Sequence, residues 1–321
     1  MPRGNPKCSD EEFINLFKTL NIKKIAHHLD TSERAVGRRR RRLEHKFGIT
    51  ISPSMSGEPV RFKYPGRINI KIQNGQVLIG SDFHIWPGEV STCLRAFKKF
   101  VSDIKPDVVI LNGDVMDFPT ISKYAQSWEK APDVWEELEA AQDHLSDIVK
   151  RCKRGSRKIW TLGNHDARFE AKIANSAPQM KKVKGVHLSD HFPLWEKAMS
   201  CMINEGIPGG ATMIKHIPQK GGVNSTRTST LNAGVSTISG HLHAQNVRPY
   251  SDYAYYDRYG VDGGMVADKE HPAFAYTNDN CLDWRSGFPL LTYQNTRLLY
   301  PELITKWSDD AVQFRGEIIS V

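Results

Sequence analysis

The segment DVVILNGDVMD, residues 107–117, decides the fold, because an apolar run of strand length passes directly into glycine and aspartate. The same organisation returns in KIWTLGNHD, residues 158–166. Between these two segments, residues 133–153 carry apolar side chains at helical spacing. Alternation of strand, helix and strand predicts an α/β sheet sandwiched by helices.

Further elements extend this pattern in both directions. The runs INIKI (68–72) and QVLIG (76–80) flank Asn74-Gly75, a dipeptide that favours a β-hairpin. A helix is predicted at 92–104, and strands are predicted around 211–216, 235–240 and 290–294. With 321 residues, of which 39% are hydrophobic and 25% charged, the chain suits one large catalytic domain and one small domain.

The first 48 residues predict a small all-α domain. Apolar positions at helical spacing predict helices from Asp10 to about Leu20, over Ile22–Leu29, and onward from Ser32. The segment IKKIAHHLDTSERAVGRRRRRLEHKFGI resembles helix-turn-helix DNA-binding modules, whose last helix enters the major groove. A trihelical bundle that docks on a protein remains the alternative, and RNA is a lesser possibility.

The whole excess of positive charge lies in this part of the chain. Residues 1–67 carry 15 Lys/Arg and 7 Asp/Glu, whereas residues 68–321 carry 29 of each. A basic module on a neutral body indicates a polyanionic partner, and we expect DNA. The expected contacts come from a run of arginines that grips phosphates with weak sequence selectivity: Arg38, Arg39, Arg41 and Arg42, with Arg40 between them.

Residues 49–67 predict a linker between domains 1–48 and 68–321, because they hold three prolines and two glycines without sustained periodicity. No apolar run approaches the ~20 residues of a membrane span. The N-terminus lacks the apolar region of a signal peptide. Five scattered cysteines without a CxxC pair predict reduced thiols in a cytoplasm, that of a bacterium or a phage-infected host.

Five polar clusters follow predicted strands, at the edge where ligands gather in open α/β sheets. Taken alone, each cluster fits a buried histidine or a turn as well as a ligand. The clusters are Asp82-Phe83-His84, Gly113-Asp114-Val115-Met116-Asp117, Gly163-Asn164-His165-Asp166, His216, and Gly240-His241-Leu242-His243.

Together these clusters reproduce the ordered pattern DxH, GDxxD, GNH(D/E), H, GHxH over residues 76–245. In this the chain resembles the calcineurin-like metallophosphoesterase superfamily. The resemblance implies a β-sandwich flanked by helices, to which the remaining C-terminal strands would belong. The segment Asp283-Trp284-Arg285-Ser286-Gly287-Phe288 also looks like sequences of phage-borne members.

The resemblance implies a centre of two divalent metal ions that activate a bridging hydroxide for attack on a phosphate. Asp114 matches the bridging carboxylate. The ligands of one ion would be Asp82, His84 and His243, and those of the other Asn164, His216 and His241. Imidazole and carboxylate donors suit Mn, which we favour, or Fe, Zn or Ni. His216 lacks the glycine that often follows this ligand in the family, so His187 and His191 are weighed as substitutes.

His165 matches the non-ligand histidine of the family. His165 would contact the phosphate or protonate the leaving oxygen. Asp117 and Asp166 would orient imidazole rings. Arg168 either meets a phosphate oxygen or pairs with Glu170 on a surface helix. The loop 118–132, with Lys123, Tyr124 and Trp128, either packs normally or forms a wall of the cleft.

The leading functional prediction is a DNA phosphodiesterase, a nuclease whose N-terminal module brings the catalytic domain to its polymer. The alternative is a phosphomonoesterase or a hydrolase of small phosphodiesters, acting on nucleotides, phosphoproteins or cyclic messengers, with a module that only localises it. A third possibility, a non-catalytic DNA-binding regulator, is disfavoured because every expected ligand and His165 are present.

Overall fold

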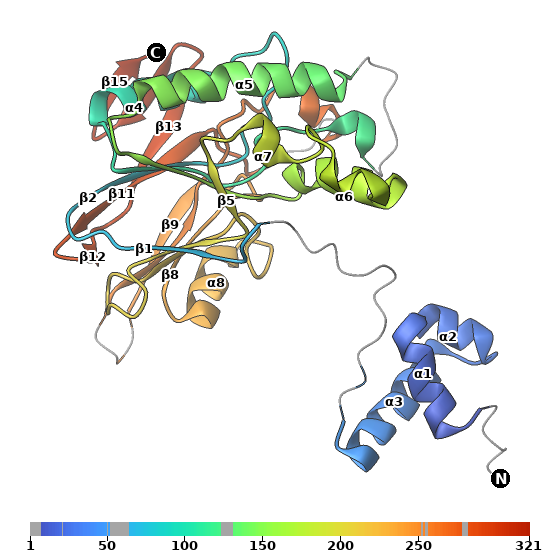
Figure 1. The fold of residues 1–321 in the computed structure, drawn as a ribbon. Helices are drawn as coiled ribbons and strands as arrows, with labels where there is room; N and C mark the ends of the chain where they lie inside the picture. Colours follow the sequence, from blue (N-terminus) through green and yellow to red (C-terminus); the bar gives the residue numbers. More distant parts are fainter. Residues whose placement is uncertain are drawn as a thin grey trace. The chain divides into compact units, whose positions relative to one another are not determined.

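The structure is a computed structural model, and it describes residues 8–20, 22–49, 51, 64–122, 131–251, 253, 256–277 and 282–321. The chain divides into two compact units, Met1–Lys63 and Tyr64–Val321. Each unit is considered by itself below (Figure 1).

The N-terminal unit contains three helices, as predicted: α1 (Asp10–Thr19), α2 (Ile22–His28) and α3 (Glu33–Phe47). Ser9 and Glu12 form a capping box that fixes the start of α1. Asp30, in the turn between α2 and α3, adopts a left-handed backbone with φ 46°. The three helices share one buried apolar cluster, which consists of Phe13, Phe17, Ile25, Ala26, Leu29, Val36, Leu43 and Ile51.

Both ends of the predicted linker 49–67 pack into the units. Ile51 is buried in the core of the N-terminal unit. Tyr64 belongs to the C-terminal unit, where its hydroxyl donates to Oε1 of Glu170 at 2.5 Å and accepts from the backbone N–H of Ser189 at 3.0 Å. Residues 52–63, the middle of the predicted linker, lie outside the described residues.

Two mixed sheets form the C-terminal unit. In the larger, the order is β15 (Glu317–Ser320), β14 (Ala311–Phe314), β13 (Glu302–Ser308), β11 (Gly287–Gln294), β2 (Gly75–Gly80), β3 (Val108–Leu111), β4 (Arg157–Thr161) and β5 (Glu196–Ala198), with β12 (Arg297–Leu298) on β11. In the smaller, the order is β1 (Ile68–Ile70), β6 (Cys201–Ile203), β7 (Thr212–Ile214), β8 (Ser236–Ser239), β10 (Arg258–Asp262) and β9 (Asn246–Tyr250).

Side chains that alternate along the strands build two cores. Val77 and Ile79 of β2 pack toward the smaller sheet, whereas Leu78 between them packs toward the helices. The strands β3 and β4 alternate in the same way. Burial on both faces of these parallel strands explains their continuous apolar runs.

Helices cover the outer faces of the sandwich (Figure 1). The helices α4 (Thr92–Ile104) and α5 (Val134–Arg151) lie along the larger sheet, and α8 (Ser225–Ala233) packs on β8, β9 and β10. The shorter elements are α6 (Asp166–Ser176), α7 (Leu188–His191), and the 3-10 turns η1 (Pro119–Ile121), η2 (Pro178–Lys182) and η3 (Pro272–Thr277). The layered α/β fold and the predicted helices at 92–104 and 133–153 are confirmed. None of the described helices is both long and apolar enough to cross a membrane.

The hairpin predicted at Asn74-Gly75 is wrong. The strand β1 pairs in parallel with β6 of the smaller sheet, whereas β2 lies in the larger sheet between β3 and β11. A two-residue type I′ turn needs positive φ at both central residues, and neither Asn74 nor Gly75 has it. Instead, Oδ1 of Asn74 accepts the N–H of Asn295 at 2.8 Å, which fixes the crossing from one sheet to the other.

Candidate metal centre

The polar clusters predicted from the sequence lie at the carboxyl ends of strands in both sheets. The neighbouring strands β2, β3 and β4 run parallel, so the loops after them open at one edge. The strands β7 and β8, which precede the two remaining clusters, are also parallel neighbours. The folding of two sheets into one sandwich therefore gathers clusters that are spread over residues 82–243.

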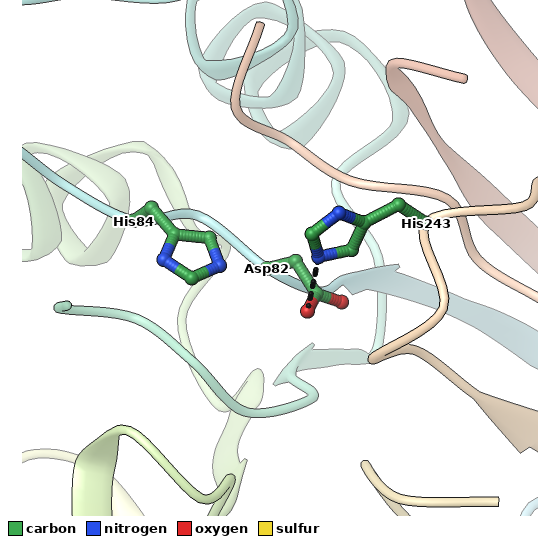
Figure 2. Close-up of side chains that lie close together, drawn as sticks. All are labelled: Asp82, His84 and His243. Carbon is green, nitrogen blue, oxygen red and sulfur yellow. Dashed lines mark hydrogen bonds and ion pairs between the residues drawn. The ribbon is translucent and has the colours of Figure 1, made fainter. Parts of the chain in front are cut away.

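Asp82, His84 and His243 form the first group of potential ligands (Figure 2). Their donor atoms lie within 4.8 Å of one another. Oδ1 of Asp82 is 3.0 Å from Nε2 of His243, and Oδ2 accepts the hydroxyl of Ser81 at 2.6 Å and the N–H of His241 at 2.9 Å. Asp82 is completely buried, so its loop is held rigidly around the carboxylate.

Asp114, His216 and His241 form the second group. Nε2 of His216 lies 3.0 Å from Oδ2 of Asp114 and 3.9 Å from Oδ1 of Asp82, so the two groups adjoin. Nδ1 of His216 lies 2.7 Å from the carbonyl oxygen of Asn112, which turns Nε2 toward the carboxylates. These two groups hold six of the seven predicted ligands, and Asn164 lies in the loop after β4. His84, Asp117 and His165 form a third group of donor atoms that lie as close together.

The donor atoms of these residues fit divalent cations. Oδ1 of Asn164 is buried and has no hydrogen-bond partner within the described part of the chain. Nε2 of His216 makes no well-aligned hydrogen bond there either, despite its short distance to Asp114. Buried polar atoms without partners are costly, and a cation would complete their coordination. Nitrogen and oxygen donors of this kind suit first-row transition metals.

The electrostatics of the two groups keep the carboxylates ionised. Burial alone would raise the pKa of Asp82, but the imidazoles of His216 and His243 lower it to about 2. The pKa of Asp114 is also lowered, chiefly by His216, against the effect of burial. Conversely, burial would lower the pKa of His216, but Asp114 and Asp82 raise it to about 10. Both carboxylates are therefore ionised at neutral pH.

Many of these residues have an unusual backbone conformation. Five of the seven predicted ligands have positive φ: Asp82 (54°), His84 (41°), Asp114 (51°), His241 (71°) and His243 (58°). Left-handed backbone is uncommon outside glycine, although Asp, Asn and His tolerate it best. Its concentration at the strand ends is typical of a functional site.

Two glycines allow the loops to approach one another closely. A Cβ atom on Gly163 would lie 2.1 Å from Oδ1 of Asp114 and 2.5 Å from its backbone nitrogen. A Cβ atom on Gly240 would lie 1.8 Å from the hydroxyl oxygen of Ser81 and 2.4 Å from Oδ2 of Asp82. The glycines of the GNH and GHxH motifs therefore serve to bring the carboxylates next to neighbouring loops.

Asp117, His165 and Arg168 form a charged cluster beside the first group. Oδ1 of Asp117 lies 3.1 Å from Nδ1 of His84 and 2.7 Å from Nδ1 of His165, so this carboxylate contacts two imidazole rings. Arg168 donates to the carbonyl oxygen of Asp117 at 2.7 Å, and its Nη2 lies 3.2 Å from Nε2 of His165. Arg168 thus belongs to the site. Glu170 instead contacts Tyr64 and His187.

Asp166 does not orient an imidazole ring, contrary to the prediction. Its buried carboxylate accepts the backbone N–H groups of Asp114 (3.0 Å), Val115 (2.9 Å) and Gly163 (2.9 Å), and the indole N–H of Trp160 (2.9 Å). The carboxylate at the first position of α6 faces back toward the loops after β3 and β4. Asp166 therefore fixes the backbone that presents the second group.

Glu137 of α5 is a supporting residue that no sequence motif indicated. Its Oε2 accepts the backbone N–H groups of Asp117 and Phe118, both at 2.9 Å, and the side chain is completely buried. Burial raises the pKa of Glu137 to about 8. On a helix with exposed Glu136 and Glu139 nearby, nothing in the sequence distinguishes it.

The two alternatives to His216 lie elsewhere. His187 contacts Glu170 at 2.9 Å and the carbonyl oxygen of Lys181 at 2.8 Å. His191 lies 2.8 Å from the carbonyl oxygen of Gly185. Lys123, Tyr124 and Trp128, from the loop that was considered as a cleft wall, lie outside the described residues.

The fold and the site define a metal-dependent phosphoesterase, a hydrolase. Residues 75–245 match the family described as calcineurin-like phosphoesterase. This segment makes up more than half of the chain, and the chain belongs to that family.

Two bacteriophage proteins are similar to this chain in sequence. The Gene 54 proteins of Mycobacterium phages D29 and L5 are 26% and 24% identical over 240 residues, which cover 71% of this chain and 92% of each relative. Among solved structures, the wild-type Vps29 complexed with zinc from Entamoeba histolytica is 16% identical, with a TM-score of 0.40, over 76% of this chain and 98% of that one.

Proposed function

We propose that the protein is a two-metal phosphodiesterase that acts on DNA, a nuclease. The observation that carries the proposal is an exposed row of basic side chains on α3, joined in one chain to a phosphoesterase centre. The row consists of Arg34, Arg38, Arg41 and His45, all exposed and spaced by four, three and four residues. This spacing places the four side chains on one helical face.

The basic row is available because the opposite face of α3 holds the helix in place. Val36 and Leu43 of α3 are buried in the core of the N-terminal unit. Arg42 is also exposed and adjoins the row. Three exposed arginines along one face match the charge pattern of a helix that contacts phosphates on DNA.

Arg39 is excluded from the proposed contact, although the sequence suggested it. Its guanidinium donates to the carbonyl oxygen of Cys8 at 2.8 Å and to Oδ1 of Asp10 at 3.0 Å, and it lies 4.4 Å from the ring centre of Phe13. Arg40 is also partly buried and lies 3.7 Å from Glu44. Arg39 therefore holds α1 against α3, whereas Arg40 forms an ion pair within α3.

The geometry of the centre supports the following catalytic roles. Bound at the two ligand groups, two divalent cations, with Mn favoured, would neutralise the phosphate and lower the pKa of a water molecule. Arg168 would bind a non-bridging phosphate oxygen. His165, whose Nδ1 faces Asp117, would use Nε2 to contact the phosphate or to give a proton to the leaving oxygen.

The alternative is hydrolysis of a phosphomonoester or a small phosphodiester. The observation that favours it is the neutral balance of residues 68–321, with 29 basic and 29 acidic side chains. A neutral catalytic unit has less attraction for a long polyanion, and the N-terminal unit would then only localise the enzyme.

The deciding experiment compares substrates of different length. Purified protein with Mn²⁺ is given plasmid DNA and an aryl phosphomonoester, alongside His84→Ala and a variant that lacks residues 1–63. We expect plasmid cleavage that disappears in His84→Ala and weakens in the truncated protein. Turnover of the monoester alone, unaffected by truncation, would contradict the nuclease proposal. Absence of bound metal and of all turnover would indicate a non-catalytic protein.

A further inference from the structure

An aromatic cluster borders the first ligand group, and the catalytic roles assigned above do not use it. The ring centre of Trp284 lies 4.4 Å from that of His243 and 5.0 Å from that of Phe274. Phe274 lies in turn 4.9 Å from His84. The two histidines flank Asp82 in Figure 2, so the cluster reaches both imidazoles of this group.

Two tryptophans near the first ligand group, Trp284 and Trp86, are partly exposed, whereas Phe274 is buried. Phe274 is only 3% exposed, which makes it a support. The ring centre of Trp86 lies 5.8 Å from that of His271, and the ring centre of His271 lies 5.6 Å from that of Phe274. Large aromatic rings that remain partly exposed beside a metal centre can offer a face to a planar ligand.

The charged and the aromatic surroundings of the centre meet at His84. The ring of His84 lies 5.0 Å from that of His165 and 4.9 Å from that of Phe274. A nucleotide has the same division, since a charged phosphate is joined to a flat apolar base. A nucleoside attached to a phosphate near His165 and Arg168 would extend past His84 toward Phe274 and Trp284, whose ring centres lie 5.0 Å apart.

We propose that Trp284, supported by Phe274 and joined by Trp86, stacks on the base next to the scissile phosphodiester. The inference rests on the proposed phosphodiesterase function and names its substrate class, which is unpaired nucleotides. Bases in a duplex have both faces covered by neighbours, whereas an unpaired base has a free face. Single strands, ends and loops are therefore cleaved in preference to intact duplex.

The test uses two esters with one defined scissile bond. One is the p-nitrophenyl ester of thymidine 5′-phosphate, and the other is the same ester of abasic deoxyribose. Full-length protein with Mn²⁺ is compared with Trp284→Leu, Trp86→Leu and, as a matched control, Trp307→Leu, which changes an exposed tryptophan of β13. The aryl group is common to both esters, so the ratio of kcat/KM reports the base alone.

The expected ratio of kcat/KM, base over abasic, is about tenfold for the wild type and for Trp307→Leu. It falls toward one in Trp284→Leu and decreases in Trp86→Leu. A ratio near one in the wild type overturns the inference whether or not any variant folds. An unchanged ratio in Trp284→Leu overturns it as well.

Failure of the inference and failure of the proposed function give different results. Plasmid cleavage with equal turnover of the two esters would remove the stacking role and leave the nuclease. Base-dependent turnover of the esters without cleavage of single-stranded or plasmid DNA would remove the nuclease and keep the stacking site. Turnover of an aryl monoester but of neither diester would overturn both.

Discussion

Nδ1 of His165 lies 2.7 Å from Oδ1 of Asp117, and the same carboxylate oxygen lies 3.1 Å from Nδ1 of His84. One carboxylate therefore orients both a predicted metal ligand and the predicted proton donor. Burial lowers the pKa of His165, but Asp117 and Asp114 raise it above its ordinary value overall. Asp117 thereby holds the imidazole of His165 in one orientation, with Nδ1 toward the carboxylate and Nε2 3.2 Å from Nη2 of Arg168.

Asp117→Asn should therefore lower kcat more for substrates with poor leaving groups. A nitrophenolate leaves without protonation, whereas an alkoxide needs a proton from His165. We expect a loss of about tenfold to hundredfold with an alkyl ester and a smaller loss with a nitrophenyl ester. Equal losses with both esters would instead indicate that Asp117 acts only by holding His84.

Asp114 and His84 should differ in their effect on metal content. Asp114 lies with the second group and adjoins the first through His216, whereas His84 belongs to the first group. After dialysis against Mn²⁺, Asp114→Asn should retain little metal and His84→Ala about half the content of the wild type. Elemental analysis by mass spectrometry measures this. Identical content in the two variants would argue against Asp114 as the bridging ligand.

Gly163→Ala should disrupt the centre although it adds one methyl group. The new Cβ would lie 2.5 Å from the backbone nitrogen of Asp114, which cannot move without breaking its bond to Asp166. We expect a loss of about 1–3 kcal/mol in the free energy of unfolding, together with reduced metal content. Gly221→Ala is the control, since no atom lies within 4 Å of its Cβ. Thermal melts of both variants decide the matter.

Glu137 should make stability depend on pH. Burial raises its pKa from 4.5 to about 8, so between these pH values the folded protein holds a proton that the unfolded chain has lost. Its contribution to stability is therefore present below pH 4.5 and decreases as pH rises toward 8. The effect of Glu137→Gln on the free energy of unfolding should be more favourable at pH 8.5 than at pH 5, by about 1–3 kcal/mol. The exposed Glu139→Gln should show no such difference in denaturant melts.

Arginines on α3 should separate into two kinds. Replacing Arg38 and Arg41 by alanine should weaken DNA binding and reduce the slope of log K against log salt by about two, since each phosphate contact contributes about 0.9. Arg39→Ala should instead loosen α1 from α3, because its bonds to Cys8 and Asp10 are lost. Hydrogen exchange in full-length protein reports the loosening. Equal salt slopes for wild type and the double variant would remove α3 from the interface.

Local sequence patterns were sufficient to predict the helices and to predict that the motifs after neighbouring strands lie together. The helix α4 was predicted at 92–104 and found at Thr92–Ile104, because its apolar side chains repeat at helical spacing and Ser91 caps its start. The motifs that hold Asp82 and Asp114 each follow a strand of the larger sheet, and the parallel pairing of these strands brings their ends together. His216 follows β7 of the smaller sheet, and only the packing of the two sheets brings it to Asp114.

Contacts between segments far apart in the chain could not be predicted in the same way. The Asn74-Gly75 dipeptide satisfies the local rule for a hairpin, but pairing of β1 with β6 in another sheet overrides it. Asp166 was predicted to orient an imidazole ring, whereas most of its partners are backbone groups that only the folded loops present. Trp284 likewise reaches His243 only through the tertiary fold.

The left-handed conformation of five predicted ligands has a consequence for transplanting this centre to another scaffold. A copy of the seven side chains on ordinary strand ends would direct them elsewhere, because each left-handed residue reverses the local course of the chain. A working graft must carry the loops together with Gly163 and Gly240, which let them pack.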